Sequence, residues 1–145
     1  MYNCIKKELL GRELSFRVEK GAFSFQHPEF PLVDCSVICG TPAVCLLADY
    51  ELKCPEMLSG RELFSIINQI NYDNDSGNLE TDGNGLIIFK INAFLPENRW
   101  QAAEVFNEVL TYFFKKAPAE FRKLEKSVYN NHINHKETQN ADSCI

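Results

Sequence analysis

LIIFKINAFL, at residues 86–95, is the clearest strand pattern in the sequence. Every second residue from Ile87 to Leu95 is apolar, so these side chains face one side of an extended strand. Lys90 and Asn92 mark the opposite side. The run therefore predicts a long strand with one buried face.

Two elements precede this strand. The turn DGNG at residues 82–85 joins it to a shorter strand at residues 78–81, which together predict a hairpin. Ser59 and Glu62 stand at capping-box spacing, because the serine hydroxyl can accept from the Glu62 amide while the carboxylate reaches back. Apolar residues follow at helical spacing, which predicts a helix over residues 60–71.

The amino-terminal third predicts a short helix and four strands. Residues 2–10 place apolar side chains on one helical side before Gly11. Residues 14–26 alternate apolar and polar around a Lys-Gly turn, as a β-hairpin does. Residues 32–39 and 43–50 are rich in apolar and β-branched side chains and predict two further strands.

A long helix is predicted after Pro96, and Pro118 suits the first turn of a helix that continues it. From about residue 129 the sequence becomes rich in Asn, His, Gln and Thr. We expect a single domain over residues 1–128 and a polar, disordered tail over residues 129–145.

Composition limits the function classes. The chain has 145 residues and a net charge of −5, and an acidic protein repels the phosphate backbone of nucleic acids. The first residues carry charges where an export signal needs an apolar segment, and no apolar run is long enough to cross a bilayer. We therefore expect a cytoplasmic protein with reduced cysteines and with no nucleic-acid or membrane partner.

The order α-β-β-β-β-α-β-β-α predicts an α+β fold with two layers, in which helices cover an antiparallel sheet. Leu86 and Ile88 point away from the predicted buried face, and residues 43–50 are apolar on both sides. Either the last helix covers one face and the first helix the other, or one face is covered by a second subunit or a partner protein.

Four patterns resemble chemical sites and have plainer explanations. The acidic loop at residues 73–78 fails the spacing of a calcium loop. His132 and His135 could hold a metal with Cys144, but a structural zinc site needs four ordered ligands. Cys39 could pair with His27 as a nucleophile, although a core thiol beside a surface histidine is the commoner arrangement.

The fourth pattern is a basic cluster, which is typical of a solvated helix end. Its members are Lys115, Lys116, Arg122, Lys123 and Lys126. We expect no catalytic residue, no cofactor and no metal.

The helix at residues 59–71, SGRELFSIINQIN, with the strand, glycine turn and strand that follow it, resembles the YbjN-like family of proposed bacterial sensory-transduction regulators. The long final helix at residues 100–124 fits the same pattern. YbjN-like domains are similar in fold to the chaperones of type III secretion, which are small, acidic and often dimeric. The resemblance implies a chaperone or regulatory role and assigns no catalytic residue.

These observations predict a non-enzymatic protein-binding domain, a chaperone-like protein or regulatory adaptor that acts as a homodimer on a client protein. The predicted contact residues are Leu86, Ile88, Trp100 and Phe114. A metal- or thiol-dependent protein and a small-molecule sensor are the alternatives.

Overall fold

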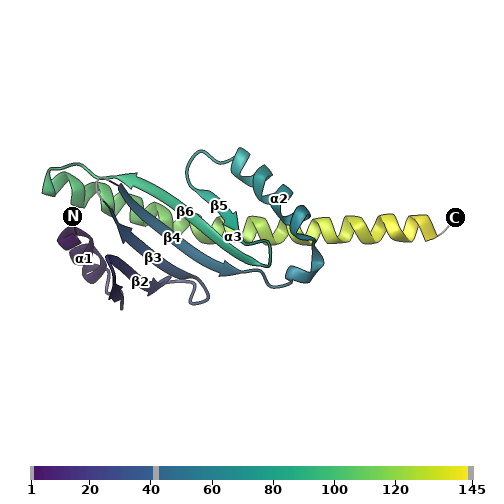
Figure 1. Ribbon diagram of the computed structural model, residues 1–145, viewed down its shortest axis with the longest axis horizontal. Helices are drawn as coiled ribbons and strands as arrows, with labels where there is room; N and C mark the ends of the chain where they lie inside the picture. Colours follow the sequence, from purple (N-terminus) through teal and green to yellow (C-terminus); the bar gives the residue numbers. More distant parts are fainter. Residues whose placement is uncertain (1, 41–42, 144–145) are drawn as a thin grey trace.

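The structure is a computed structural model that describes residues 2–40 and 43–143, with side chains for residues 3–40 and 43–136. Over these residues the chain forms three α-helices, a short 3-10 turn (Pro55–Met57) and six strands (Figure 1). The α-helices are α1 (Tyr2–Gly11), α2 (Gly60–Tyr72) and α3 (Arg99–Ser143). The predicted order of helices and strands is confirmed.

The strands form one antiparallel sheet in the order β1-β2-β3-β4-β6-β5. They are β1 (Arg17–Glu19), β2 (Ala22–Gln26), β3 (Asp34–Cys39), β4 (Ala43–Glu51), β5 (Asn78–Thr81) and β6 (Leu86–Phe94). β4 and β6 pair along their whole lengths, from Ala43 opposite Phe94 to Glu51 opposite Leu86. The strand predicted at residues 86–95 is therefore β6, which lies between β4 and β5 in the sheet and has one buried face.

One face of the sheet, the inner face, carries the core. Val44 and Leu46 of β4 and Ile87 and Phe89 of β6 are fully buried on it. Figure 1 shows α3 running behind the sheet along the long axis of the molecule, with α1 and α2 packed against it at different points along its length. The two-layer α+β architecture is confirmed.

Of the two alternatives for the second face of the sheet, the one in which α1 covers it is wrong. Ile5 and Leu9 of α1 are fully buried in the same core cluster as the inner-face residues. The described helices therefore share one face, because the other face alternates with it along every strand.

α2 begins where the capping box predicts. The Ser59 hydroxyl accepts from the Glu62 amide at 3.2 Å, and the Glu62 carboxylate accepts from the Ser59 amide at 3.2 Å. The chain leaves α2 through Gly77, whose φ is +80°. A Cβ atom there would lie 2.5 Å from the Phe89 ring, so only glycine fits this approach to the core.

Pro118 lies inside one continuous helix, and its predicted place in the first turn of a new helix is wrong. Proline has no amide hydrogen to donate to the Phe114 carbonyl four residues back. The His27 Nε2 lies 2.7 Å from that carbonyl oxygen and takes the place of the missing donor. The helix continues because a side chain of the β2–β3 loop satisfies the orphaned acceptor.

His27 is buried, with 3% of its surface exposed, so its expected place on the surface is also wrong. Its Nδ1 accepts from the amides of Glu29 and Phe30 at 3.1 and 3.2 Å. Both ring nitrogens are therefore used within the fold. The predicted pairing of Cys39 with His27 is not formed, because the two residues lie at opposite ends of the β2–β3 pair. The His27 amide donates to the Val33 carbonyl at one end, and the Cys39 amide donates to the Gly21 carbonyl at the other.

α3 continues to Ser143, and the disorder of residues 129–145 stays a prediction. Asn131 donates to the Glu62 carboxylate at 2.9 Å, and the His135 Nε2 lies 3.0 Å from the same group. These contacts connect the tail to the start of α2. The hydrogen bond from Asn131, with help from Ser59 and His135, lowers the pKa of Glu62.

Candidate protein-binding site

The second face of the sheet, the outer face, combines apolar side chains with a polar surround. Its apolar members are Ile38, Cys45, Leu47, Leu86, Ile88 and Phe94. Ile38 is 42% exposed and Phe94 is 73% exposed, while the others are half-buried by their neighbours in the sheet. Among the described residues no helix covers these side chains, because the core cluster places α1, α2 and α3 on the inner face.

The strand register places the apolar side chains of the outer face among polar ones. Ile38 lies directly opposite Cys45, whereas Leu47 lies opposite Lys90 and Ile88 lies opposite Asp49. Leu47 and Ile88 are diagonal neighbours, close enough for long side chains to touch. The result is a small apolar patch across β3, β4 and β6, the apolar strip, which Lys90 and Asn92 separate from Phe94.

Two acidic residues border this strip. Asp34 and Asp49 are opposite each other on β3 and β4, and Asp49 is opposite Ile88 on β6. Partial burial, and then the nearby charge of Asp34, raise the pKa of Asp49 above its usual value. Like charges that face each other across strands cost stability, so a cationic group of a partner would be favoured here.

The edges of the sheet offer less to a partner than its face. The Asn71 side chain of α2 donates to the Leu79 carbonyl and accepts from the Leu79 amide, each at 2.8 Å. These bonds occupy the outward-pointing amide and carbonyl of Leu79 in β5, as a further strand would. At the opposite edge, β1 is only three residues long.

The predicted contact residues do not form one cluster. Leu86 and Ile88 lie on the outer face, as predicted. Trp100 is 83% exposed in the first turn of α3. Phe114 lies on the helix side of the molecule, where its ring packs edge-on against Phe25 and His27.

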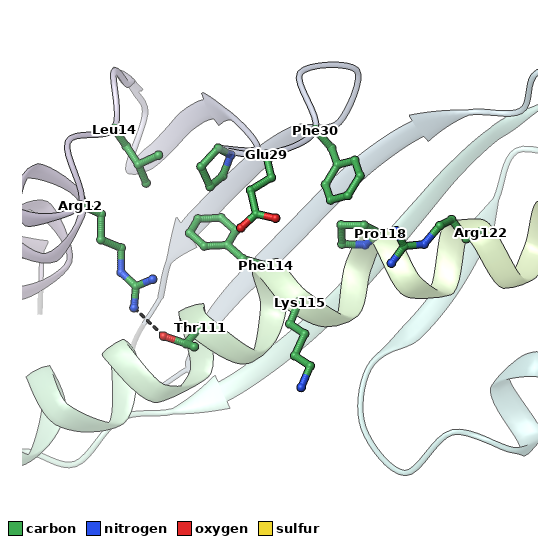
Figure 2. Close-up of a pocket in the computed structure, with 10 residues that line it drawn as sticks. Arg12, Leu14, Glu29, Phe30, Thr111, Phe114, Lys115, Pro118 and Arg122 are labelled. Carbon is green, nitrogen blue, oxygen red and sulfur yellow. Dashed lines mark hydrogen bonds between the residues drawn. The ribbon is translucent and has the colours of Figure 1, made fainter.

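Phe114 belongs to a groove that sequence reasoning missed. Figure 2 shows Arg12 just after α1, Glu29 and Phe30 from the β2–β3 loop, and Pro118 and Arg122 from α3 around one cavity. The basic cluster of α3 was the one sequence signal for this groove, because two of its members, Lys115 and Arg122, line the groove. No local pattern indicated that the loop and the end of α1 meet them there.

Cys35, Cys39 and Cys45 lack the lowered pKa that a nucleophilic thiol needs. Burial, followed by the charges of Asp34 and Asp49, raises the pKa of Cys35 to about 12. Burial also raises the pKa of Cys45 and of Cys39. A thiol with a raised pKa is protonated at neutral pH, and the thiolate is the reactive form.

The possible metal ligands of the sequence serve other contacts. Within the described residues, no three His, Cys, Asp or Glu side chains gather in a way that could hold a metal ion. Cys144, the third predicted ligand, lies outside those residues. In the acidic loop, Asn74 donates to the buried Glu120 of α3 at 3.0 Å, and Lys116 makes an ion pair with the same carboxylate at 3.2 Å.

No helix among residues 2–40 and 43–143 combines the length and the apolar character that a bilayer span needs. No protein-family model and no curated protein matches the chain.

Several solved structures share its architecture. YbjN from E. coli matches with a TM-score of 0.53 at 14% identity, over 94% of this chain and 93% of that chain. A chain of the HopA1–SchA chaperone–effector complex matches with a TM-score of 0.55 at 10% identity, over 86% and 91%. SycH, a type III secretion chaperone of Yersinia pestis solved with a fragment of YscM2, matches with a TM-score of 0.52 at 12% identity, over 82% and 98%.

At these identities the likeness concerns the fold, and the predicted resemblance is confirmed at that level. The chain has the fold that YbjN and the type III secretion chaperones share.

Proposed function

We propose that this chain is a non-enzymatic protein-binding domain, a chaperone-like protein or regulatory adaptor, and that it binds a client protein through its outer face. One observation carries the proposal. The outer face keeps an apolar strip partly exposed, while the described helices pack together on the inner face.

The physical argument concerns the alternation of each strand. A sheet that faces water on one side normally carries polar residues there. Here Ile38 is exposed near the half-buried Leu47 and Ile88, and Phe94 is exposed at the far end of β6. Apolar surface left on a sheet face favours an interaction site, because covering it removes apolar area from water.

Similar folds support a protein partner. SchA was solved in a chaperone–effector complex, and SycH was solved with a fragment of YscM2. Polar contacts around the strip would orient the partner. Asp34 and Asp49 are suited to a basic side chain of that partner.

The geometry favours binding across the face over strand addition at an edge. Asn71 occupies the backbone groups of Leu79 on β5, and the other edge strand has three residues. An added strand needs a row of free amides and carbonyls, whereas an apolar strip needs only a complementary surface.

A second copy of the chain is the proposed partner when no client is present. Two outer faces related by a two-fold axis would bury the same strip on both subunits. We expect a homodimer in size-exclusion chromatography with light scattering at micromolar concentration.

Changing Ile88 to Asp tests the outer face. The buried carboxylate would oppose any partner, so Ile88→Asp should give a monomer and abolish client binding, while circular dichroism and cooperative unfolding persist. A photo-crosslinking amino acid in place of Phe94 should give adducts with the bound protein, which mass spectrometry identifies.

Tyr72 provides the matched control, because it is 86% exposed at the end of α2 and lies off the outer face. Tyr72→Asp should leave the oligomeric state and client binding unchanged, and a crosslinker at position 72 should give no adduct. Because an Asp at position 88 would face Asp49 and Glu80, Ile88→Lys is the companion variant without like-charge repulsion. If both variants unfold the protein, Ile88 is a core residue and its assignment to the interface is wrong.

The alternative of a metal- or thiol-dependent protein has its own test. Stoichiometric zinc in elemental analysis of the purified protein, or a thiol that titrates far faster than the rest, would favour that alternative over client binding.

A further inference from the structure

We propose that the groove on the helix side is a second protein-binding site, which takes an extended acidic segment carrying apolar side chains between its carboxylates. This site is separate from the outer face, and its occupancy does not depend on the function proposed above.

The groove consists of two adjoining cavities along α3. The first has a volume of about 680 Å³ and the second about 350 Å³, and both are lined by Phe30, Pro118 and Arg122. On α3 the lining extends from Thr111 to Glu125. At 1.5 Å per residue this length is about 21 Å, which roughly six residues of an extended segment would span.

Cations dominate the first cavity. Arg12, Lys115 and Arg122 line it, with Glu29 as its acidic member. Among the described residues, Lys115 and Arg122 make no ion pair with a carboxylate, whereas Arg12 pairs with Glu8 at 3.1 Å, so the free positive charge of the cavity comes from Lys115 and Arg122. A surplus of positive charge in a protein with a net charge of −5 indicates a site for an anionic partner.

The two guanidinium groups are held in place before a ligand arrives. Arg12 donates to the Asn107 carbonyl at 3.0 Å and to the Thr111 hydroxyl at 2.7 Å, and it lies 5.8 Å from the centre of the Phe114 ring (Figure 2). Arg122 lies 5.6 Å from the centre of the Phe30 ring. Fixed donors lose little conformational entropy when they bind a carboxylate, which favours affinity.

The second cavity supplies the apolar part of the site. Leu32 is 81% exposed at its rim, and Val33 and Phe121 line it. Its acidic member, Glu125, already accepts from the Tyr50 hydroxyl at 2.6 Å and from the Lys53 amide at 3.0 Å. An apolar side chain of the partner would rest there while neighbouring carboxylates reach Arg122.

The chemistry of the groove favours a peptide over a nucleic acid. The protein as a whole carries a net charge of −5, which disfavours a long polyanion such as a nucleic acid. Alternate side chains of an extended segment point to opposite sides. The carboxylates of such a segment of about six residues would face the cations of α3, while its apolar side chains would face Phe30 and Leu32 of the loop.

Fluorescence anisotropy with a labelled hexapeptide of sequence DLDFDL tests the proposal. The peptide should bind the full-length protein, and 0.5 M salt should weaken binding. The matched peptide NLNFNL should bind at least about tenfold more weakly, because it lacks the charges that the groove recognises. Short single-stranded DNA should not compete with the labelled peptide.

Charge reversal in the groove provides the second arm. The double variant Lys115→Glu/Arg122→Glu should weaken binding at least about tenfold, and Glu29→Gln should strengthen it. Lys123 and Lys126 are exposed on the same helix and line neither cavity, so Lys123→Glu/Lys126→Glu is the control and should change the dissociation constant by less than about twofold.

Several results would overturn the proposal. They are the absence of DLDFDL binding at millimolar peptide, equal affinity for NLNFNL, equal loss in the control variant, and tighter binding of the DNA. Ile88→Asp should leave peptide binding unchanged, so failure of the groove proposal is distinguishable from failure of the outer-face proposal.

Discussion

Among single residues, His27 and Pro118 act as a pair. The proline removes a hydrogen bond from the interior of α3, and the imidazole donates to the Phe114 carbonyl that is left without a partner. The same ring accepts from the Glu29 and Phe30 amides, so it also shapes the loop that lines the groove.

A double-mutant cycle measures this coupling. His27→Ala should destabilise the protein by about 1–3 kcal/mol, because it leaves the buried Phe114 carbonyl unsatisfied. The same change should cost less in a Pro118→Ala background, since Ala at position 118 can donate its own amide to that carbonyl. Urea denaturation of the four proteins gives the coupling energy. Strictly additive losses would show that the histidine does not serve the proline.

Cys35 gives a prediction about alkaline pH. Its folded pKa of about 12 lies above its ordinary value of 9.0, so the unfolded chain loses the thiol proton first. The contribution of Cys35 is complete below pH 9 and is lost as the pH rises towards 12, with a slope of up to about 1.4 kcal/mol per pH unit.

Denaturation curves at pH 8 and pH 10.5 check this contribution. Cys35→Val keeps a side chain of similar size without an ionisable group, so its free energy of unfolding should fall less between the two pH values than that of the unchanged protein. Identical losses in both proteins would show that Cys35 does not carry the pH dependence.

Among the elements, α2 and β5 are held together by one side chain. Asn71 pairs with both backbone groups of Leu79 and closes the edge of the sheet. Without it, β5 would present a free amide and carbonyl to other chains.

Asn71→Ala should lower the free energy of unfolding by about 1–2 kcal/mol, through the two lost hydrogen bonds. Asn68 is exposed on the same helix, and Asn68→Ala should change it by less than about 0.5 kcal/mol. Thioflavin binding on prolonged incubation should rise for Asn71→Ala alone. Equal stability of the two variants would contradict the proposed role of Asn71.

The elements were predictable from the sequence because their signals are local. The alternation from Ile87 to Leu95 identifies the buried face of β6, and Ser59 with Glu62 identifies the start of α2. The place of Pro118 inside one continuous helix is not predictable in this way, because it depends on a contact that is not local. Its partner His27 is distant in the sequence, and no local pattern links an imidazole in a loop to a carbonyl in a helix.

The same reasoning applies to the candidate sites. Period-two alternation placed Leu86 and Ile88 on the outer face, but it contained no information on Trp100 or Phe114, which lie elsewhere. The groove combines Arg12 from the start of the chain with Arg122 from its last helix. Such a meeting depends on how α1 packs on α3, and that packing is a property of the tertiary fold.

For the whole molecule, the core ends before the tail does. Among the described residues, Val128 is the last member of the buried cluster, and Asn131 and His135 contact the carboxylate of Glu62 in α2. The assignment of residues 1–128 to one domain stays a prediction.

Truncation after residue 128 tests this assignment. The shortened chain should unfold in one cooperative transition, with a free energy of unfolding reduced by no more than about 1–2 kcal/mol, because exposed polar contacts contribute little. Thermal denaturation followed by circular dichroism measures the change. A truncated chain without a cooperative transition would place the tail within the domain.

The order of the elements also affects how the protein is made. All six strands precede α3 in the chain, so a ribosome releases the sheet before the helix that covers its inner face. At 5–20 residues per second, residues 99–128 take about 2–6 seconds to synthesise. During that interval only α1 and α2 can cover the inner face, so the apolar surface that α3 will bury stays exposed to water and open to aggregation.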